Sequence, residues 1–129
     1  MFEFDCMWKN DQEPIQLQSK LFIKTGAHYE VVALYEVELI TATPSASWVW
    51  TASKSVRVEK SLEVLLEMLP PNEFYRIDGV TICRISLIEA LVTDSQGHYY
   101  VEYASQQHPI LTISRRRYYD LRRALQSGL

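Results

Sequence analysis

Apolar and polar positions alternate over short stretches of this chain, and the pattern predicts a protein made mainly of β-strands. After Leu17, apolar runs are separated by clusters of glycine, proline and small polar residues, which are typical of turns between strands. Residues 25–28, which include Gly26, predict the first hairpin connection. The expected strands are 21–24, 29–34, 37–41, 47–51, 56–58, 74–77, 91–93, 99–103 and 110–113, with a further apolar stretch from Ile82. These spacings are too short for the crossover helices of parallel sheets, so we expect antiparallel sheets.

Two segments have the period of an amphipathic helix instead. The first begins after Ser61, a good N-cap residue, and ends before two consecutive prolines. The second runs from Arg115 to about Gln126, with Ser114 as its N-cap and Gly128 beyond its end. A single helical turn is expected at 86–90. The residues expected on the buried faces are Leu62, Leu65, Leu66 and Leu69 in the first helix, and Tyr118, Leu121 and Leu125 in the second. The predicted fold class is therefore mainly β with short α-helices.

Length and composition are sufficient for one compact domain. A chain of 129 residues with 47% hydrophobic side chains needs neither a metal nor a disulfide to fold. Residues 1–17 lack a clean period, so we expect an N-terminal extension at 1–17 and a single folded domain at 18–129. Phe2, Phe4 and Trp8 are expected to attach the extension to the body of the protein or to a second subunit.

The sequence shows no feature of a membrane or secreted protein. No apolar run reaches the roughly 18 residues of a membrane span. The start of the chain is acidic, whereas a signal peptide starts with basic residues. Cys6 and Cys83 lack the spacing of a metal or redox motif and are expected to be free thiols. We therefore expect a cytoplasmic protein without membrane insertion.

Net charge is unevenly distributed along the chain. The formal net charge of −3 argues against a nucleic-acid partner when taken as a whole. Residues 1–110, however, hold eight basic and fifteen acidic side chains, a net charge of −7, whereas residues 111–129 hold five arginines and Asp120, a net charge of +4. The basic end of the chain is therefore the part in which to look for a polyanionic partner.

Catalytic and metal-binding motifs are missing from the sequence. Three histidines, His28, His98 and His108, lie in or beside expected turns and lack the spacing of metal ligands. Glu36 and Glu38 would share one face of a strand, where a solvated surface is the more common role than a carboxylate pair with a shared proton. We therefore expect no enzyme, no metal and no cofactor.

Aromatic residues are abundant, and the pattern places most of them in the core. Trp48 and Trp50 share one face of an expected strand, as do Tyr99 and Tyr103. Burial explains these pairs better than base stacking on a sheet surface.

Five arginines are concentrated in nine residues at the start of the last helix. Arg115, Arg116 and Arg117 occupy its first turn, where free backbone N–H groups also favour an anion. The guanidinium group forms forked hydrogen bonds with phosphate and with the O6/N7 edge of guanine. The alternative is a solvated helix surface on which Arg116, Asp120 and Arg123 pair with one another.

Three blocks of the sequence carry a family resemblance, namely residues 37–42, residues 61–77 and the strand-to-helix junction at 113–116. In this order they resemble the LytTR DNA-binding domain found at the C-terminus of many bacterial response regulators. The resemblance extends from about Leu21 to Leu125. It implies small antiparallel sheets of the LytTR type and DNA binding through loops. It also implies a direct-repeat promoter site in double-stranded DNA and a role in bacterial transcription regulation.

Carried over residue by residue, the resemblance implies contacts from three segments. The DNA-binding residues expected in this chain are Ser45, Gly79, Arg84, Arg115, Arg116 and Arg117. The middle segment departs from the family pattern: Asp78 stands where the family usually has histidine, Gly79 at an often basic position, Val80 at a serine and Arg84 at an asparagine. A homodimer and a protein partner are both compatible with this sequence. The alternative function is a LytTR-like protein-interaction module that modulates another regulator instead of binding DNA.

Overall fold

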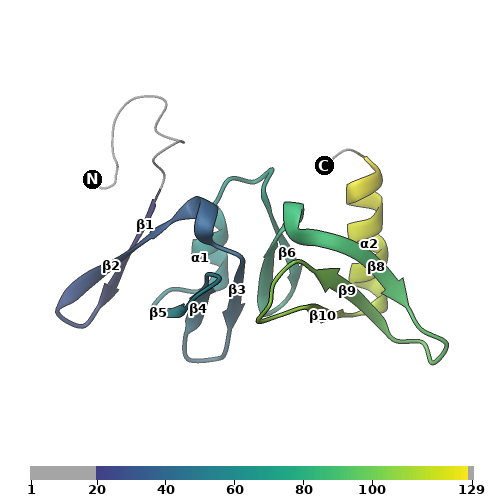
Figure 1. Cartoon of the computed structure of the whole chain (residues 1–129), viewed down its shortest axis with the longest axis horizontal. Coiled ribbons are helices and arrows are strands. Elements are labelled where there is room, and N and C mark those ends of the chain that lie inside the picture. Colours follow the sequence, from purple (N-terminus) through teal and green to yellow (C-terminus); the bar gives the residue numbers. More distant parts are fainter. Residues whose placement is uncertain (1–19, 128–129) are drawn as a thin grey trace. The chain divides into compact units, whose positions relative to one another are not determined.

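The computed structural model describes residues 20–127, and β-strands predominate among them (Figure 1). The strands are β1 (Lys20–Thr25), β2 (His28–Ala33), β3 (Leu39–Ala42), β4 (Ser47–Trp50), β5 (Ser55–Val58), β6 (Phe74–Asp78), β7 (Thr81–Arg84), β8 (Ile88–Thr93), β9 (Tyr99–Tyr103) and β10 (Ile110–Ile113). The helices are α1 (Leu62–Glu67) and α2 (Arg115–Gln126), with short 3-10 turns at Leu34–Glu36 and Ile85–Leu87. All strand pairs are antiparallel, as predicted.

The chain divides after Glu36 into two compact units, and the first contains the β1–β2 hairpin. Gly26 has a φ of 62°, a left-handed conformation that glycine adopts at little cost, and this permits the tight turn between the strands. The hairpin prediction is confirmed. The expected extension at 1–17, with Phe2, Phe4 and Trp8, lies outside the described residues, as does Gly128.

The second unit is built around a five-stranded sheet of order β5-β4-β3-β7-β6. Side chains in neighbouring strands form rows across it, and alternate rows point to opposite faces. One row contains Trp50, Leu39, Cys83 and Tyr75, and the next contains Val49, Ile40, Ile82 and Arg76. Helix α1 contacts β3 and β7, with Leu62 and Leu65 buried, as its leucine spacing predicts.

Helix α1 begins and ends where the sequence predicts. The Ser61 hydroxyl accepts a hydrogen bond from the backbone N–H of Val64 at 3.3 Å, which caps the first turn. The helix ends at Glu67, and Met68 forms the C-cap two residues before the first proline.

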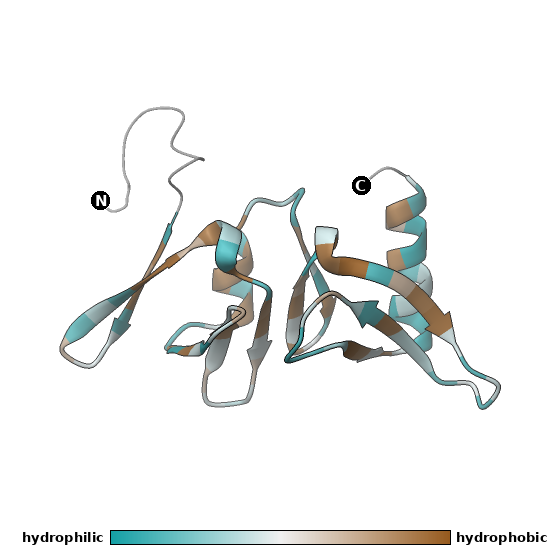
Figure 2. Cartoon of the chain, in the orientation of Figure 1, coloured by the Kyte–Doolittle hydropathy of each residue, from teal (hydrophilic) through white to brown (hydrophobic). Residues whose placement is uncertain are grey.

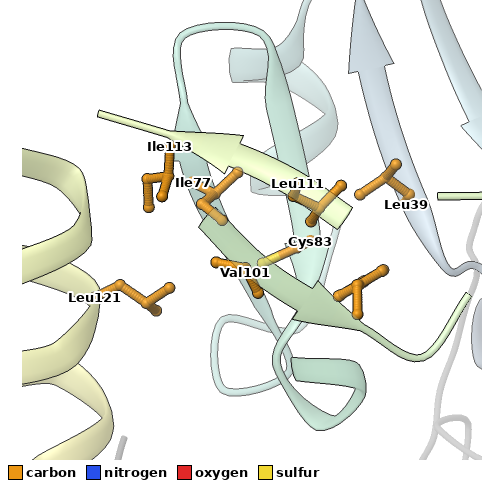
Figure 3. Close-up of a cluster of buried hydrophobic side chains, with 8 residues drawn as sticks. Leu39, Ile77, Cys83, Val101, Leu111, Ile113 and Leu121 are labelled. Carbon is orange, nitrogen blue, oxygen red and sulfur yellow. The ribbon is translucent and has the colours of Figure 1, made fainter. Parts of the chain in front are cut away.

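A second sheet, of order β10-β9-β8, and helix α2 complete the core. Figure 3 shows Leu121 of α2 directed toward Val101 of β9, beside Ile77 and Cys83 of the five-stranded sheet. Tyr118 and Leu125 pack against the same cluster, so the predicted inward stripe of α2 is confirmed. The members of this hydrophobic cluster are Leu39, Ile77, Cys83, Val101, Tyr103, Leu111, Ile113 and Leu121. Apolar and polar segments alternate along α2 in Figure 2, as this one-sided packing requires.

One polar side chain, Tyr103, connects the two sheets, and a second, Arg84, braces the five-stranded sheet. The hydroxyl of Tyr103 on β9 accepts a hydrogen bond from the backbone N–H of Arg84 at 2.7 Å and donates one to the carbonyl of Glu38. The guanidinium of Arg84 donates to the carbonyl of Val37 at 2.8 Å and to Glu73 Oε1 at 3.2 Å, and it lies 4.4 Å from the centre of the Phe74 ring. These groups fasten β7 to the segment that leads into β3.

Three expectations from the sequence need correction. The turn expected at 86–90 is a 3-10 turn at Ile85–Leu87, and the following residues already pair with β9 as part of β8. Trp48 and Trp50 are only half-buried, because the fully buried face of β4 is that of Ser47 and Val49. Glu36 ends a 3-10 turn while Glu38 precedes β3, so these two carboxylates do not lie on one strand.

Candidate nucleic-acid interface

The loop between β3 and β4 presents hydroxyl groups to solvent. Thr43, Pro44 and Ser45 are exposed, whereas Ala46 is buried. The loop is closed by a backbone hydrogen bond from Thr43 N–H to the carbonyl of Ala46 at 2.8 Å, and the hydroxyls of Thr43 and Ser45 lie 3.3 Å apart. Ser45 is therefore a neutral hydrogen-bonding group held on a well-defined turn.

The turn between β6 and β7 lies beside this loop. The backbone N–H of Ala42, the last residue of β3, donates to the carbonyl of Val80 at 2.8 Å. Because β3 and β7 are neighbours in the sheet, the β3–β4 loop and the β6–β7 turn emerge at the same end. The structure thus brings Ser45 and Gly79 to one edge, although 33 residues separate them in the sequence.

Internal hydrogen bonds fix the shape of the β6–β7 turn. The carboxylate of Asp78 accepts the backbone N–H of Val80 at 2.8 Å. The guanidinium of Arg76 donates to the carbonyls of Asp78 and Gly79, at 3.2 and 3.0 Å, and to Glu63 of α1 at 3.0 Å. Asp78, which departs from the family pattern, therefore has a structural role in the turn.

Gly79 itself is exposed and unobstructed. A side chain added at this position would meet no atom within 4 Å of its Cβ, and the backbone is not in the left-handed region. Larger side chains are therefore compatible with the turn.

Helix α2 begins with three arginines that differ in exposure. The Ser114 hydroxyl caps the helix by accepting the backbone N–H of Arg117 at 3.2 Å. Arg115 and Arg116 are exposed, and 89% of the Arg116 side chain is accessible. Arg117 is half-buried, and its charge acts on the hydroxyl of Tyr75 on β6.

Asp120 balances part of the positive charge on α2. Its carboxylate forms an ion pair with Arg123, and its second oxygen lies 4.0 Å from Nε of Arg116. Burial first, and then the Asp120 carboxylate, raise the pKa of Tyr75, while Arg117 and Arg123 act in the opposite direction. The self-paired surface that the sequence left open as an alternative is therefore present in part, on the Arg116–Asp120–Arg123 row.

The end of the five-stranded sheet that carries the β3–β4 loop and the β6–β7 turn has paired acidic and basic side chains nearby. Glu59 pairs with Arg57 at 3.1 Å, and Glu63 pairs with Arg76 at 3.0 Å. A hydrogen bond from its own backbone N–H and then the Arg76 guanidinium lower the pKa of Glu63. The positive charge of the second unit is thus concentrated at the first turn of α2 rather than at the loops.

Lys60 is a basic residue that sequence reasoning missed. It is exposed, and its backbone carbonyl accepts a hydrogen bond from the Ser47 hydroxyl at 2.7 Å, so it lies beside the first residue after the β3–β4 loop. The pairing of Ser47 with Val58 brings it there. No local motif marks Lys60, because only this register makes it a neighbour of the loop.

Arg84, in contrast, does not face outward. Only 12% of its side chain is accessible, and its guanidinium is held by the carbonyl of Val37, the carboxylate of Glu73 and the ring of Phe74. This position does not support the expected contact between Arg84 and DNA, because the guanidinium is largely used for contacts within the protein.

Two of the histidines form local hydrogen bonds in or beside hairpin turns. His28 bonds with Thr25 Oγ1 at 3.0 Å in the first hairpin, and His98 bonds with Asp94 at 3.0 Å in the β8–β9 turn. The pKa of Asp94 is lowered, chiefly by the hydrogen bond that its carboxylate accepts from the backbone N–H of His98. Between residues 20 and 127, no three histidine, cysteine or acidic side chains are grouped as metal ligands.

Small antiparallel sheets, two exposed loops at one sheet end and an exposed basic helix start are together typical of one class of protein: a small, mainly β nucleic-acid-binding domain. A family model of the LytTr DNA-binding domain matches residues 27–126, and the chain therefore belongs to the LytTR family of DNA-binding domains. Membership in this family supports DNA binding as the function of the chain.

A solved structure has the same fold. It is a LytTr DNA-binding domain from Bacillus cereus, similar to this chain with a TM-score of 0.69 and 19% sequence identity over 83% of this chain and 96% of that one. A comparison with curated proteins gives no match. Within residues 20–127, no helix is long and apolar enough to cross a membrane.

Proposed function

We propose that this protein binds double-stranded DNA in a sequence-specific manner and regulates bacterial transcription from a direct-repeat promoter site, in the cytoplasm. The observation that carries the proposal is the exposure of three segments of the second unit. A backbone hydrogen bond joins the end of β3 to the β6–β7 turn, so the β3–β4 loop and this turn lie at one end of the five-stranded sheet, and α2 presents Arg115 and Arg116 to solvent. Family membership supplies the class of ligand.

The three segments have different roles in this proposal. Arg115, Arg116 and Arg117 approach phosphates, and the exposed Arg116 also reaches a guanine edge in the major groove. Ser45 and the backbone at Gly79 contribute neutral hydrogen bonds that fix the register of the protein on the duplex. Lys60, beside the β3–β4 loop, adds a further phosphate contact.

This division of roles follows from the charges. Each acid at the sheet end is engaged, Glu59 by Arg57, Glu63 by Arg76 and Asp78 by a backbone N–H. The loops therefore offer a nearly neutral surface, which can lie close to DNA without strong repulsion. Long-range attraction and base reading then come from α2, and the loops position the protein on the duplex.

The test is a binding experiment on duplexes selected from a random library. We expect Arg116→Ala to weaken binding to the selected duplex by ~1–3 kcal/mol and to random duplex by less. Loss of one phosphate contact lowers the magnitude of the log–log salt slope by about 0.9. Lys54→Ala is the matched control, because Lys54 lies in the β4–β5 connection at the other end of the β4–β5 hairpin. An equal loss for Arg116→Ala on both duplexes would remove the base-reading role.

The alternative is a protein-interaction module on the same scaffold. It predicts an affinity for any duplex weaker than ~10⁻⁴ M at physiological salt, together with binding to a separate regulator. Asp78 departs from the family pattern, but its carboxylate shapes the β6–β7 turn, so its presence does not by itself favour this alternative. A homodimer on the DNA remains part of the proposal and would appear as two protein molecules per selected duplex.

A further inference from the structure

The β1–β2 hairpin is apolar on both faces. Leu21, Ile23 and Val32 are buried on one face. The other face carries the cross-strand pair Phe22 and Val31, which are 56% and 47% exposed. Large apolar side chains that are exposed side by side in this way form a candidate docking surface.

Two lysines border this outer face. Lys24 is paired with Tyr29, which is 62% exposed, and Lys20 is paired with Ala33. The outer face of the hairpin is defined here as Lys20, Phe22, Lys24, Tyr29, Val31 and Ala33. Its chemistry fits a partner that is both aromatic and acidic.

The segment that precedes β1 has that composition. Residues 1–19 contain four acids and one lysine, a net charge of −3. Phe2 and Phe4 alternate with Glu3 and Asp5, which would place both rings on one side of an extended segment, and Trp8 follows. We propose that residues 2–8 of this chain dock on the outer face of its own β1–β2 hairpin.

Chain length permits this arrangement. Residues 9–19 form a link of eleven residues that can span up to ~35 Å, whereas the six residues of β1 extend over about 20 Å. The proposal requires a chain reversal between residues 9 and 19, and the sequence at 10–14 is polar and contains Pro14, a composition typical of turns. A tether this short gives the segment an effective concentration in the millimolar range at the hairpin, which favours it over a free partner.

Cys6 lies in the docking segment and serves as a natural probe. In Val31→Cys, the new thiol is on the outer face, and mild oxidation should form an intramolecular Cys6-to-position-31 disulfide. His28→Cys is the matched control, because position 28 is on the same strand with its side chain 69% exposed but belongs to the opposite face. Cys83 is buried and does not compete for the oxidant. Tyr29→Cys provides a second probe of the outer face should Val31→Cys fail to fold.

The full-length chain is oxidised at low concentration, and disulfides are assigned by peptide mapping. We expect the intramolecular disulfide to form at least about tenfold faster in Val31→Cys or Tyr29→Cys than in His28→Cys, because docking raises the local thiol concentration on one face. The double change Phe2→Ser, Phe4→Ser should remove this difference. Equal rates for both faces would overturn the proposal. Predominant disulfide-linked dimers through position 31 would overturn it as well, and would assign the outer face to a second copy of the chain.

Discussion

Replacing Tyr103 with phenylalanine tests how the two sheets of the second unit are held together. The Tyr103 side chain is 3% exposed, and its hydroxyl bridges the backbone N–H of Arg84 and the carbonyl of Glu38. Tyr103→Phe keeps the ring and removes both hydrogen bonds. Each of the two buried backbone groups that lose their partner costs about 1–3 kcal/mol, so we expect the free energy of unfolding to fall by about 2–6 kcal/mol.

Chemical denaturation monitored by circular dichroism measures this loss. Tyr100→Phe is the matched control, because Tyr100 is half-buried on the same strand with its side chain on the opposite face. We expect the control to change stability by less than about 0.5 kcal/mol. A loss below that value for Tyr103→Phe as well would refute the conclusion that this hydroxyl ties β9 to the five-stranded sheet.

The pH dependence of stability provides an independent check on Tyr103. Burial raises the pKa of its hydroxyl above the ordinary value of 10, so the folded state favours the protonated form. The stabilisation is complete below the pKa of the unfolded chain and decreases as pH rises above about 10. Alkaline destabilisation should therefore be smaller in Tyr103→Phe than in the unmodified protein.

Three further predictions concern the interface and the core. Asp120→Asn should raise affinity for any duplex and increase the magnitude of the salt slope, because it releases Arg116 and Arg123 from a competing carboxylate. Unchanged binding in a salt titration would place α2 away from the DNA. Gly79→Arg should tighten binding by about tenfold or more, because the position is open and a new phosphate contact is worth about 1.4 kcal/mol or more at low salt. The control is Ser95→Arg in the turn between β8 and β9. Gly97 in that turn is unsuitable for the control because its φ is 84°. Cys83 should not react with a thiol reagent at pH 8 in the folded protein, because burial raises the pKa of its thiol to about 12. In a Cys6→Ser background, labelling of Cys83 should appear only when the protein unfolds. Rapid labelling of the native protein would contradict the burial of Cys83.

Local sequence signals predict the elements of this fold well. Leucine spacing and Ser61 define α1, and Ser114 defines the start of α2, because helix period and capping depend on residues close together in the chain. The β1–β2 hairpin is equally local, since Gly26 sets its turn. The misplaced turn near Ser86 has the same origin: residues 88–90 are strand because they pair with β9, and that partner lies outside the local window.

The candidate interface depends on long-range contacts, and the sequence predicts less of it. Ser45 and Gly79 are brought together by the β3–β7 pairing, which no local pattern specifies. Arg84 resembles a free cation in the sequence, yet Val37 and Glu73 enclose its guanidinium. Lys60 shows the opposite case, because the β4–β5 register alone brings it beside the loop.

The ratio of two affinities tests DNA recognition most directly. The protein is titrated against a fluorescent duplex selected from a random library and against the same duplex with its sequence scrambled, at physiological salt. We predict that the selected duplex binds at least ~10³-fold more tightly, the lower end of the range for sequence-specific proteins. Equal affinities for the two duplexes, both weaker than ~10⁻⁴ M, would contradict sequence-specific DNA binding by this chain.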